Sequence, residues 1–105
     1  MAKVYVLGDD GHDLSNAKEF GDILFVKEEG KYKVFSPSEV IVELKEQLRW
    51  FTGEDYLLIS GSPFVMGLAM SMLFLSTMDK VNVLLFDAKK RQYFPRTITS
   101  NQLEI

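Results

Sequence analysis

The sequence contains no cysteine, three prolines and a single histidine in 105 residues. The absence of cysteine excludes a disulfide scaffold. Basic side chains are also few, since 12 Lys and Arg stand against 15 Asp and Glu, for a net charge of -3. A protein that coats nucleic acid needs a basic face. We therefore expect no nucleic-acid partner.

What the chain has is apolar content: 47% of its residues are hydrophobic. At this length a chain buries roughly two thirds of its unfolded surface, which is enough for folding without metal or disulfide. The composition therefore predicts one globular domain over residues 1–105.

The segment from Tyr56 to Met78 has no charged residue. About 20 apolar residues can span a bilayer, so a transmembrane helix is one interpretation. Ser60-Gly61-Ser62-Pro63 interrupts the run, however, and its flanks show no positive bias and no tryptophan. We predict instead a strand over 56–60 and a buried helix from Pro63 to about Met78. Because the N-terminus enters a strand directly and shows no signal peptide, we expect a cytoplasmic protein without a membrane partner.

Apolar runs and turn residues divide the rest of the chain. Continuous runs are typical of strands buried on both faces of a parallel sheet. The predicted strands are 4–7, 23–26, 56–60 and 81–86, followed by an edge strand at 93–99 that contains Pro95. Alternation over 31–35 suggests a hairpin arm. A short helix ends near Gly21, and a second helix runs from a capping box at Ser36 and Glu39 to Gly53.

Alternating strands and helices predict an α/β fold of three layers. We expect a flavodoxin-like or Rossmann-like, mostly parallel sheet of four to five strands with an antiparallel C-terminal edge strand. The expected order is 2-1-3-4, with the last strand beside the fourth. Ligands bind such sheets where the winding reverses, outside the carboxyl ends of strands 1 and 3. The loops 8–14 and 60–64 would flank that crevice.

Both loops carry candidate ligand-binding residues. Ser60, Gly61 and Ser62 precede a helix N-terminus, which suits a phosphate or carboxylate, although a serine before proline is also an ordinary N-cap. No Walker lysine and no G-x-G-x-x-G pattern is present. The signal therefore indicates an anion without identifying it.

The other loop gathers Asp9, Asp10, Asp13 and His12. Carboxylates at a strand end hold Mg²⁺ or bind a ribose, so Asp9 and Asp10 are candidate metal ligands and Mg²⁺ a possible cofactor. The same residues also describe a simple turn before a capped helix. Because carboxylates would repel a bound phosphate, either a divalent cation mediates, or the acids contact the sugar or base, or basic groups compensate. Lys89 after strand 4 could supply that basic charge.

The helix that begins at Pro63 is apolar on every side. One side packs on the sheet and the other needs a second cover, either the hairpin arm or a second copy of the chain. Gly67 and Ser71 would permit close approach of a neighbouring helix. The predicted interface residues are Met66, Met70, Leu73 and Phe74.

Two resemblances bear on function. The acidic pair after the first strand resembles receiver domains of two-component signalling, but strand 3 ends in Ser60 and strand 4 in Asp87, so the phospho-accepting chemistry is absent. The stretch from Gly11 to Gly21 is similar to segments of small uncharacterised phage-type α/β proteins. That resemblance implies an accessory protein in a bacterial cytoplasm, a setting that includes nucleotide-signal binders similar to ligand-binding modules of CRISPR-associated proteins.

Three functions remain open. The first is a non-catalytic, homo-oligomeric module that binds a nucleotide or another phosphorylated small molecule. The second is an interaction protein, such as a host-directed inhibitor, that works through the apolar helix 63–78. The third is a metal-dependent phosphoester hydrolase that uses Asp9, Asp10 and His12.

Overall fold

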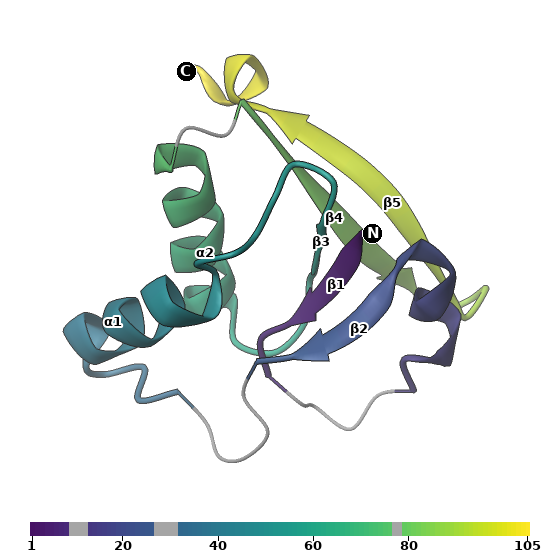
Figure 1. Ribbon diagram of the computed structural model, residues 1–105, viewed down its shortest axis with the longest axis horizontal. Coiled ribbons are helices and arrows are strands. Elements are labelled where there is room, and N and C mark those ends of the chain that lie inside the picture. The colour runs from purple at the N-terminus through teal and green to yellow at the C-terminus, as the bar shows by residue number, and fades with distance from the viewer. Residues whose placement is uncertain (9–12, 27–31, 77–78) are drawn as a thin grey trace.

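The computed structural model describes residues 1–8, 13–26, 32–76 and 79–105. Its five-stranded sheet has the order β2-β1-β3-β4-β5. The first four strands are parallel to their neighbours, and β5 pairs antiparallel with β4. This is the predicted strand order, and the α/β class is confirmed (Figure 1). The strands are β1 (Lys3–Val6), β2 (Asp22–Phe25), β3 (Tyr56–Leu58), β4 (Lys80–Asp87) and β5 (Gln92–Thr99).

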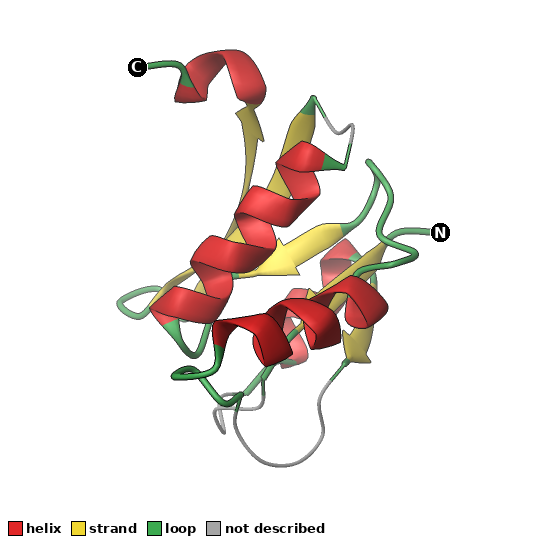
Figure 2. Ribbon diagram, turned by 90° about the vertical axis from the view of Figure 1, so that its left-hand side faces the viewer, coloured by secondary structure: helices red, strands yellow, loops and turns green. Residues whose placement is uncertain are grey.

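Two α-helices lie on one face of the sheet, as Figure 2 shows. They are α1 (Pro37–Gln47) and α2 (Pro63–Leu75). Between them and the sheet lies the larger core, to which Tyr5, Leu44 and Leu57 contribute side chains that are almost completely buried. This face therefore has the helical cover that the continuously apolar strands require.

The opposite face is covered by a short 3-10 helix, η1 (Ser15–Phe20). Beneath it a smaller core contains Val4, Ala17 and Leu84. A second 3-10 helix, η2 (Ser100–Leu103), ends the chain beyond β5. Both sheet faces are thus buried in part, but the second cover is one short helix, so this arrangement does not confirm three layers or a flavodoxin-like assignment.

The entry to α1 differs from the sequence prediction. Residues 32–35 form no strand, so the described part of the predicted hairpin arm is a turn. The Ser36 side chain makes no capping bond, and Glu39 instead pairs with Lys33, with 3.8 Å between Oε2 and Nζ. The Ser36 carbonyl still accepts the first helical bonds, from the N–H groups of Glu39 and Val40. The predicted capping box is therefore wrong, because the Ser36 N–H, from which Glu39 would accept, donates instead to the Lys33 carbonyl at 2.8 Å.

Both α-helices are shorter than predicted. α1 ends at Gln47 rather than near Gly53, and α2 ends at Leu75. The expectation that α2 lacks an exposed side is also wrong: Phe64, Gly67, Ser71 and Leu75 form an exposed stripe at helical spacing. Among the helices of the described ranges, none is long and apolar enough to cross a membrane.

Candidate functional site

The strand order brings the carboxyl ends of β1 and β3 together. The chain leaves β1 toward η1 on one face and leaves β3 toward α2 on the other. Such a reversal opens a crevice outside the sheet in doubly wound folds. The predicted residues Asp9, Asp10 and His12 follow β1 in the sequence and lie outside the described residues. The β3 side, residues 60–62, is described in full.

Ser60 is the unusual residue on the β3 side. Its hydroxyl oxygen is buried and has no hydrogen-bond partner in the structure. A buried hydroxyl without a partner carries a desolvation cost of about 1–3 kcal/mol. A buried polar group of this kind needs an explanation, and a ligand or an ordered water bound at the hydroxyl would be one.

The next two residues shape the turn into α2. Gly61 has φ +75°, a left-handed conformation in which other residues are strained, whereas a Cβ there would meet no atom within 4 Å. Glycine is therefore required by the backbone and not by a lack of space. The turn directs the chain from the end of β3 into the helix.

Ser62 is the N-cap of α2. Its Oγ accepts from the Val65 N–H at 3.4 Å, and its carbonyl accepts from Met66 N–H at 3.0 Å. Ser62 thus accepts from two amides at the start of α2, and Pro63 has no N–H to donate. In this turn the Phe64 amide is left without a bond to Ser62. The Ser62 hydroxyl thus has a structural role, and an anion here would use the Ser60 hydroxyl and the Phe64 amide.

Tyr32 and Gln47 connect the residues that directly follow β1 and β2, Leu7 and Val26. The Tyr32 hydroxyl lies 2.7 Å from the Leu7 carbonyl oxygen and 2.6 Å from Gln47 Oε1. Gln47 Nε2 donates to the Val26 carbonyl at 3.3 Å. Burial raises the pKa of Tyr32 to about 12, so its hydroxyl stays protonated at neutral pH. Sequence reasoning missed this pair, because Tyr32 was assigned to a hairpin arm and no pattern singled out Gln47.

Lys89 lies in the turn between β4 and β5. Leu84 is the last residue of β4 that pairs with β3, opposite Leu58. β4 continues from there to Asp87, so this turn lies beyond the level of Ser60. Asp87 Oδ1 accepts from the N–H groups of Lys89 and Lys90, at 2.9 and 3.2 Å. Lys89 therefore lies in the turn of the neighbouring strand and not in the Ser60 loop.

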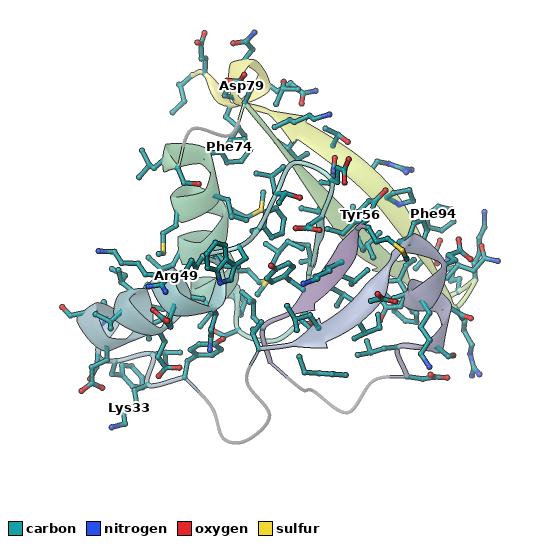
Figure 3. All side chains as sticks on the ribbon, in the orientation of Figure 1. Lys33, Arg49, Tyr56, Phe74, Asp79 and Phe94 are labelled. Carbon is teal, nitrogen blue, oxygen red and sulfur yellow. The ribbon has the colours of Figure 1, made fainter. Side chains whose placement is uncertain are left out.

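Beside this turn is a hollow of about 520 Å³ between η1 and β5. Arg91 has φ +52°, and its carbonyl accepts from Asn16 Nδ2 at 2.6 Å, which ties the turn to η1. Lys90 Nζ lies 5.7 Å from the centre of the Phe94 ring. Phe94 is labelled near this turn in Figure 3. The basic cluster is thus organised mainly by local structural contacts.

The predicted interface residues of α2 divide into two groups. Met66 and Leu73 are buried in the protein's own core. Met70 and Phe74 are partly buried against the same core. An interface with a second copy through these four residues stays a prediction.

Asp55 is buried at the amino-terminal ends of the strands, opposite the crevice. Its carboxylate accepts from the Lys3 N–H at 2.8 Å and from the Thr52 N–H at 2.8 Å. Thr52 Oγ1 donates to it at 3.1 Å. These donors account for the burial of the charge, so Asp55 is a structural residue. Over the described ranges no group of three or more His, Cys, Asp or Glu is arranged to hold a metal.

The fold and site define a small α/β protein whose five-stranded sheet reverses its winding between β1 and β3, beside a buried Ser60 hydroxyl. The chain belongs to the phage Pam3 gp32-like protein family, whose model matches residues 2–100. This confirms the resemblance to phage proteins that the segment Gly11 to Gly21 suggested. Searches of curated proteins and of solved structures found no match.

Proposed function

We propose that this phage-family protein is a non-catalytic module of flavodoxin-like fold that binds a nucleotide or another phosphorylated small molecule. The ligand would lie between the loops after β1 and β3. The buried Ser60 hydroxyl without a partner carries the proposal, because a bound phosphate oxygen would accept from it.

The proposal assigns roles to the neighbouring residues. The Phe64 amide and the positive end of α2 would face the same phosphate. Lys89 would add positive charge from the adjacent turn, and Mg²⁺ held by Asp9 and Asp10 would offset repulsion between carboxylates and ligand. His12 would contact the sugar or base.

A thermal-shift panel of mono-, di- and cyclic nucleotides, each with and without Mg²⁺, tests the proposal. We expect at least one ligand at millimolar concentration to raise Tm by about 5 °C. Absence of any shift across the panel would contradict the proposal.

The variant Ser60→Ala tests the role of the hydroxyl directly. Without ligand it should unfold at the same or a higher temperature, because the removed hydroxyl makes no hydrogen bond. With ligand it should lose most of the shift. The matched control is Ser71→Ala, whose exposed hydroxyl bonds only the Gly67 carbonyl of its own helix. Equal shifts in Ser60→Ala and the unmodified chain would remove Ser60 from the site.

A second candidate is self-association through the exposed stripe of α2. Phe64 is 43% exposed, and neither α2 nor its caps carry a charge, so two copies could meet there without like-charge repulsion. Phe64→Glu should lower the mass measured by sedimentation, whereas Val42→Glu on α1 should not. An unchanged mass in Phe64→Glu would contradict this candidate.

A further inference from the structure

A groove of about 920 Å³ runs between the C-terminal parts of α1 and α2. It lies on the helix-covered face, toward the amino-terminal ends of β3 and β4, and so away from the crevice. In Figure 3 Arg49 lies beside the end of α1, and Asp79 lies beyond the end of α2. The groove is open along one side rather than enclosed.

The floor of the groove is apolar. Its side chains come from both helices and from the segment that leads into β3: Leu44, Leu48, Phe51, Met72, Leu73 and Leu75. Leu75, which lines the groove, is 84% exposed. Trp50 is 75% exposed, and its two neighbours in the sequence, Arg49 and Phe51, line the groove. Large apolar side chains that stay in water around a groove mark a surface that a partner covers.

The rim of the groove is basic in a chain that is acidic as a whole. Lys45, Arg49 and Lys80 line it, against the single carboxylate of Asp79. Arg49 Nη2 also lies 3.1 Å from Glu46 Oε2, but both side chains are more than half exposed, so water screens that pair and leaves Arg49 available. The net charge of the whole chain is -3, so this rim runs against the average charge of the surface.

We propose that the groove docks an acidic amphipathic helix of a partner protein. The apolar side of that helix would cover Leu48, Met72 and Leu75, and its carboxylates would pair with the basic rim. A second copy of this chain fits less well, because a two-fold contact at this surface would bring Lys45, Arg49 and Lys80 against the same cations. The open shape also favours a helix over a fatty acid, which would leave much of its apolar surface in water.

A model peptide tests the proposal on the full-length protein. The probe is a fluorescein-labelled helix of about five turns with leucines along one side and glutamates on the other. We expect saturable binding in fluorescence anisotropy and a change in the emission of Trp50, the only tryptophan of the chain. A peptide with lysine in place of each glutamate, and a scrambled peptide, should each bind about tenfold more weakly or not at all.

Variants then locate the binding surface. Leu75→Glu and the double variant Lys45→Glu with Lys80→Glu should each weaken binding about tenfold, since all three side chains are exposed or on the rim and the fold does not depend on them. The matched control is Val42→Glu, an exposed α1 position outside this groove, and it should bind as the unmodified chain does. With ¹³C-methyl methionine, the signal of Met72 should move and that of Met1 should not.

Several outcomes would each overturn the proposal. They are no saturable binding of the acidic peptide at millimolar concentration, equal binding of the acidic and lysine peptides, and equal loss in Leu75→Glu and Val42→Glu. Preferential binding of decanoate or of a single-stranded oligonucleotide, with no binding of the acidic peptide, would assign the groove to a different ligand and also overturn it. Because Ser60 lies outside the groove, this result is independent of the nucleotide panel. Leu75 belongs both to the groove and to the exposed stripe of α2, so the variant with Lys45→Glu and Lys80→Glu, which leaves that stripe unchanged, separates peptide binding from self-association.

Discussion

At the scale of single residues, two buried polar groups differ in what they bind. Asp55 is 3% exposed and receives hydrogen bonds from Lys3 and Thr52, so its charge is compensated. Ser60 has a buried hydroxyl with no partner. The first pattern is typical of a residue retained for stability, and the proposed phosphate contact would explain the second. Burial alone therefore does not distinguish the two residues, whereas their hydrogen-bond partners do.

Asp55→Ala should lower the free energy of unfolding by about 3 kcal/mol, because it leaves two buried N–H groups and the Thr52 hydroxyl without their acceptor. Urea unfolding followed by circular dichroism measures the change. The control is Asp22→Ala at the exposed start of β2, which should change stability by less than about 0.5 kcal/mol. Similar losses in both variants would show that Asp55 has no special role.

Tyr32 should make stability fall at alkaline pH. Its pKa is about 12 in the folded protein, above the ordinary value of 10.0 that applies once the chain unfolds. Between these values the unfolded chain has lost the phenolic proton while the folded chain still holds it, so the free energy of unfolding decreases as pH rises. Burial also raises the pKa of Tyr5, with a smaller effect from Asp55, and this acts in the same direction.

The measurement is the urea midpoint at intervals from about pH 8 to about pH 12. Tyr32→Phe should be less stable at neutral pH, because it loses the hydrogen bond that the single hydroxyl proton donates to the Leu7 carbonyl or to Gln47 Oε1, and should show a flatter decline above about pH 10. Parallel declines in the two proteins would contradict the prediction.

At the scale of elements, the two serine-proline helix starts look alike in sequence and differ in structure. Ser62 caps α2 with its side chain, whereas the Ser36 side chain makes no cap. Ser36-Pro37 and Ser62-Pro63 both predict an N-cap followed by proline at the first helical position. The difference lies in the conformation before each helix, which no local pattern encodes.

Ser62→Ala should therefore lower the free energy of unfolding by about 1 kcal/mol. Ser36→Ala, the matched control, should change it by less than about 0.5 kcal/mol. Chemical denaturation of the two variants under identical conditions measures the contrast. Equal destabilisation would mean that the Ser36 hydroxyl also caps its helix in solution.

The edge strand β5 has two residues that discourage pairing with strands of other molecules, Pro95 and Arg96. Pro95 has no N–H to offer, and its carbonyl oxygen accepts from Arg96 Nη1 at 2.7 Å. A proline and a charged side chain at a sheet edge discourage association between sheets. Pro95 was predicted to mark an edge strand, and the topology confirms it.

Replacing both residues, Pro95→Val with Arg96→Thr, should increase concentration-dependent association in sedimentation velocity. The control is Lys18→Val, which adds an exposed valine to η1 outside any strand and should leave association unchanged. An edge variant that sediments like the unmodified chain would show that other features protect β5.

At the scale of the whole molecule, the sheet has one well-covered face and one thinly covered face. The core under α1 and α2 includes twelve buried residues and the core under η1 includes six. β4 lies between β3 and β5, whereas β2 is an edge strand with no fully buried residue. Stability should therefore be unevenly distributed, lowest at the β2 edge and highest in the centre of the sheet.

Native-state hydrogen exchange tests this distribution. Amides in the centre of β4 should exchange only through global unfolding, and those of β2 should exchange about tenfold faster or more through local opening. A uniform rate across both strands would indicate that the sheet opens as one unit.

The sequence by itself determined the α/β class, because continuous apolar runs and turn residues mark buried strands wherever they occur. The strand order was predicted by assuming a flavodoxin-like winding, and the sheet has that order. Its segment from Gly11 to Gly21 also indicated the phage family. The tertiary structure alone decided which side of α2 is buried, because a helix that is apolar all round carries no periodic signal to orient it. Met66 and Leu73 are on the buried side. It also decided the Tyr32 and Gln47 contact and the groove between α1 and α2. These features join residues far apart in the chain, and their geometry depends on how the helices pack and not on any local pattern.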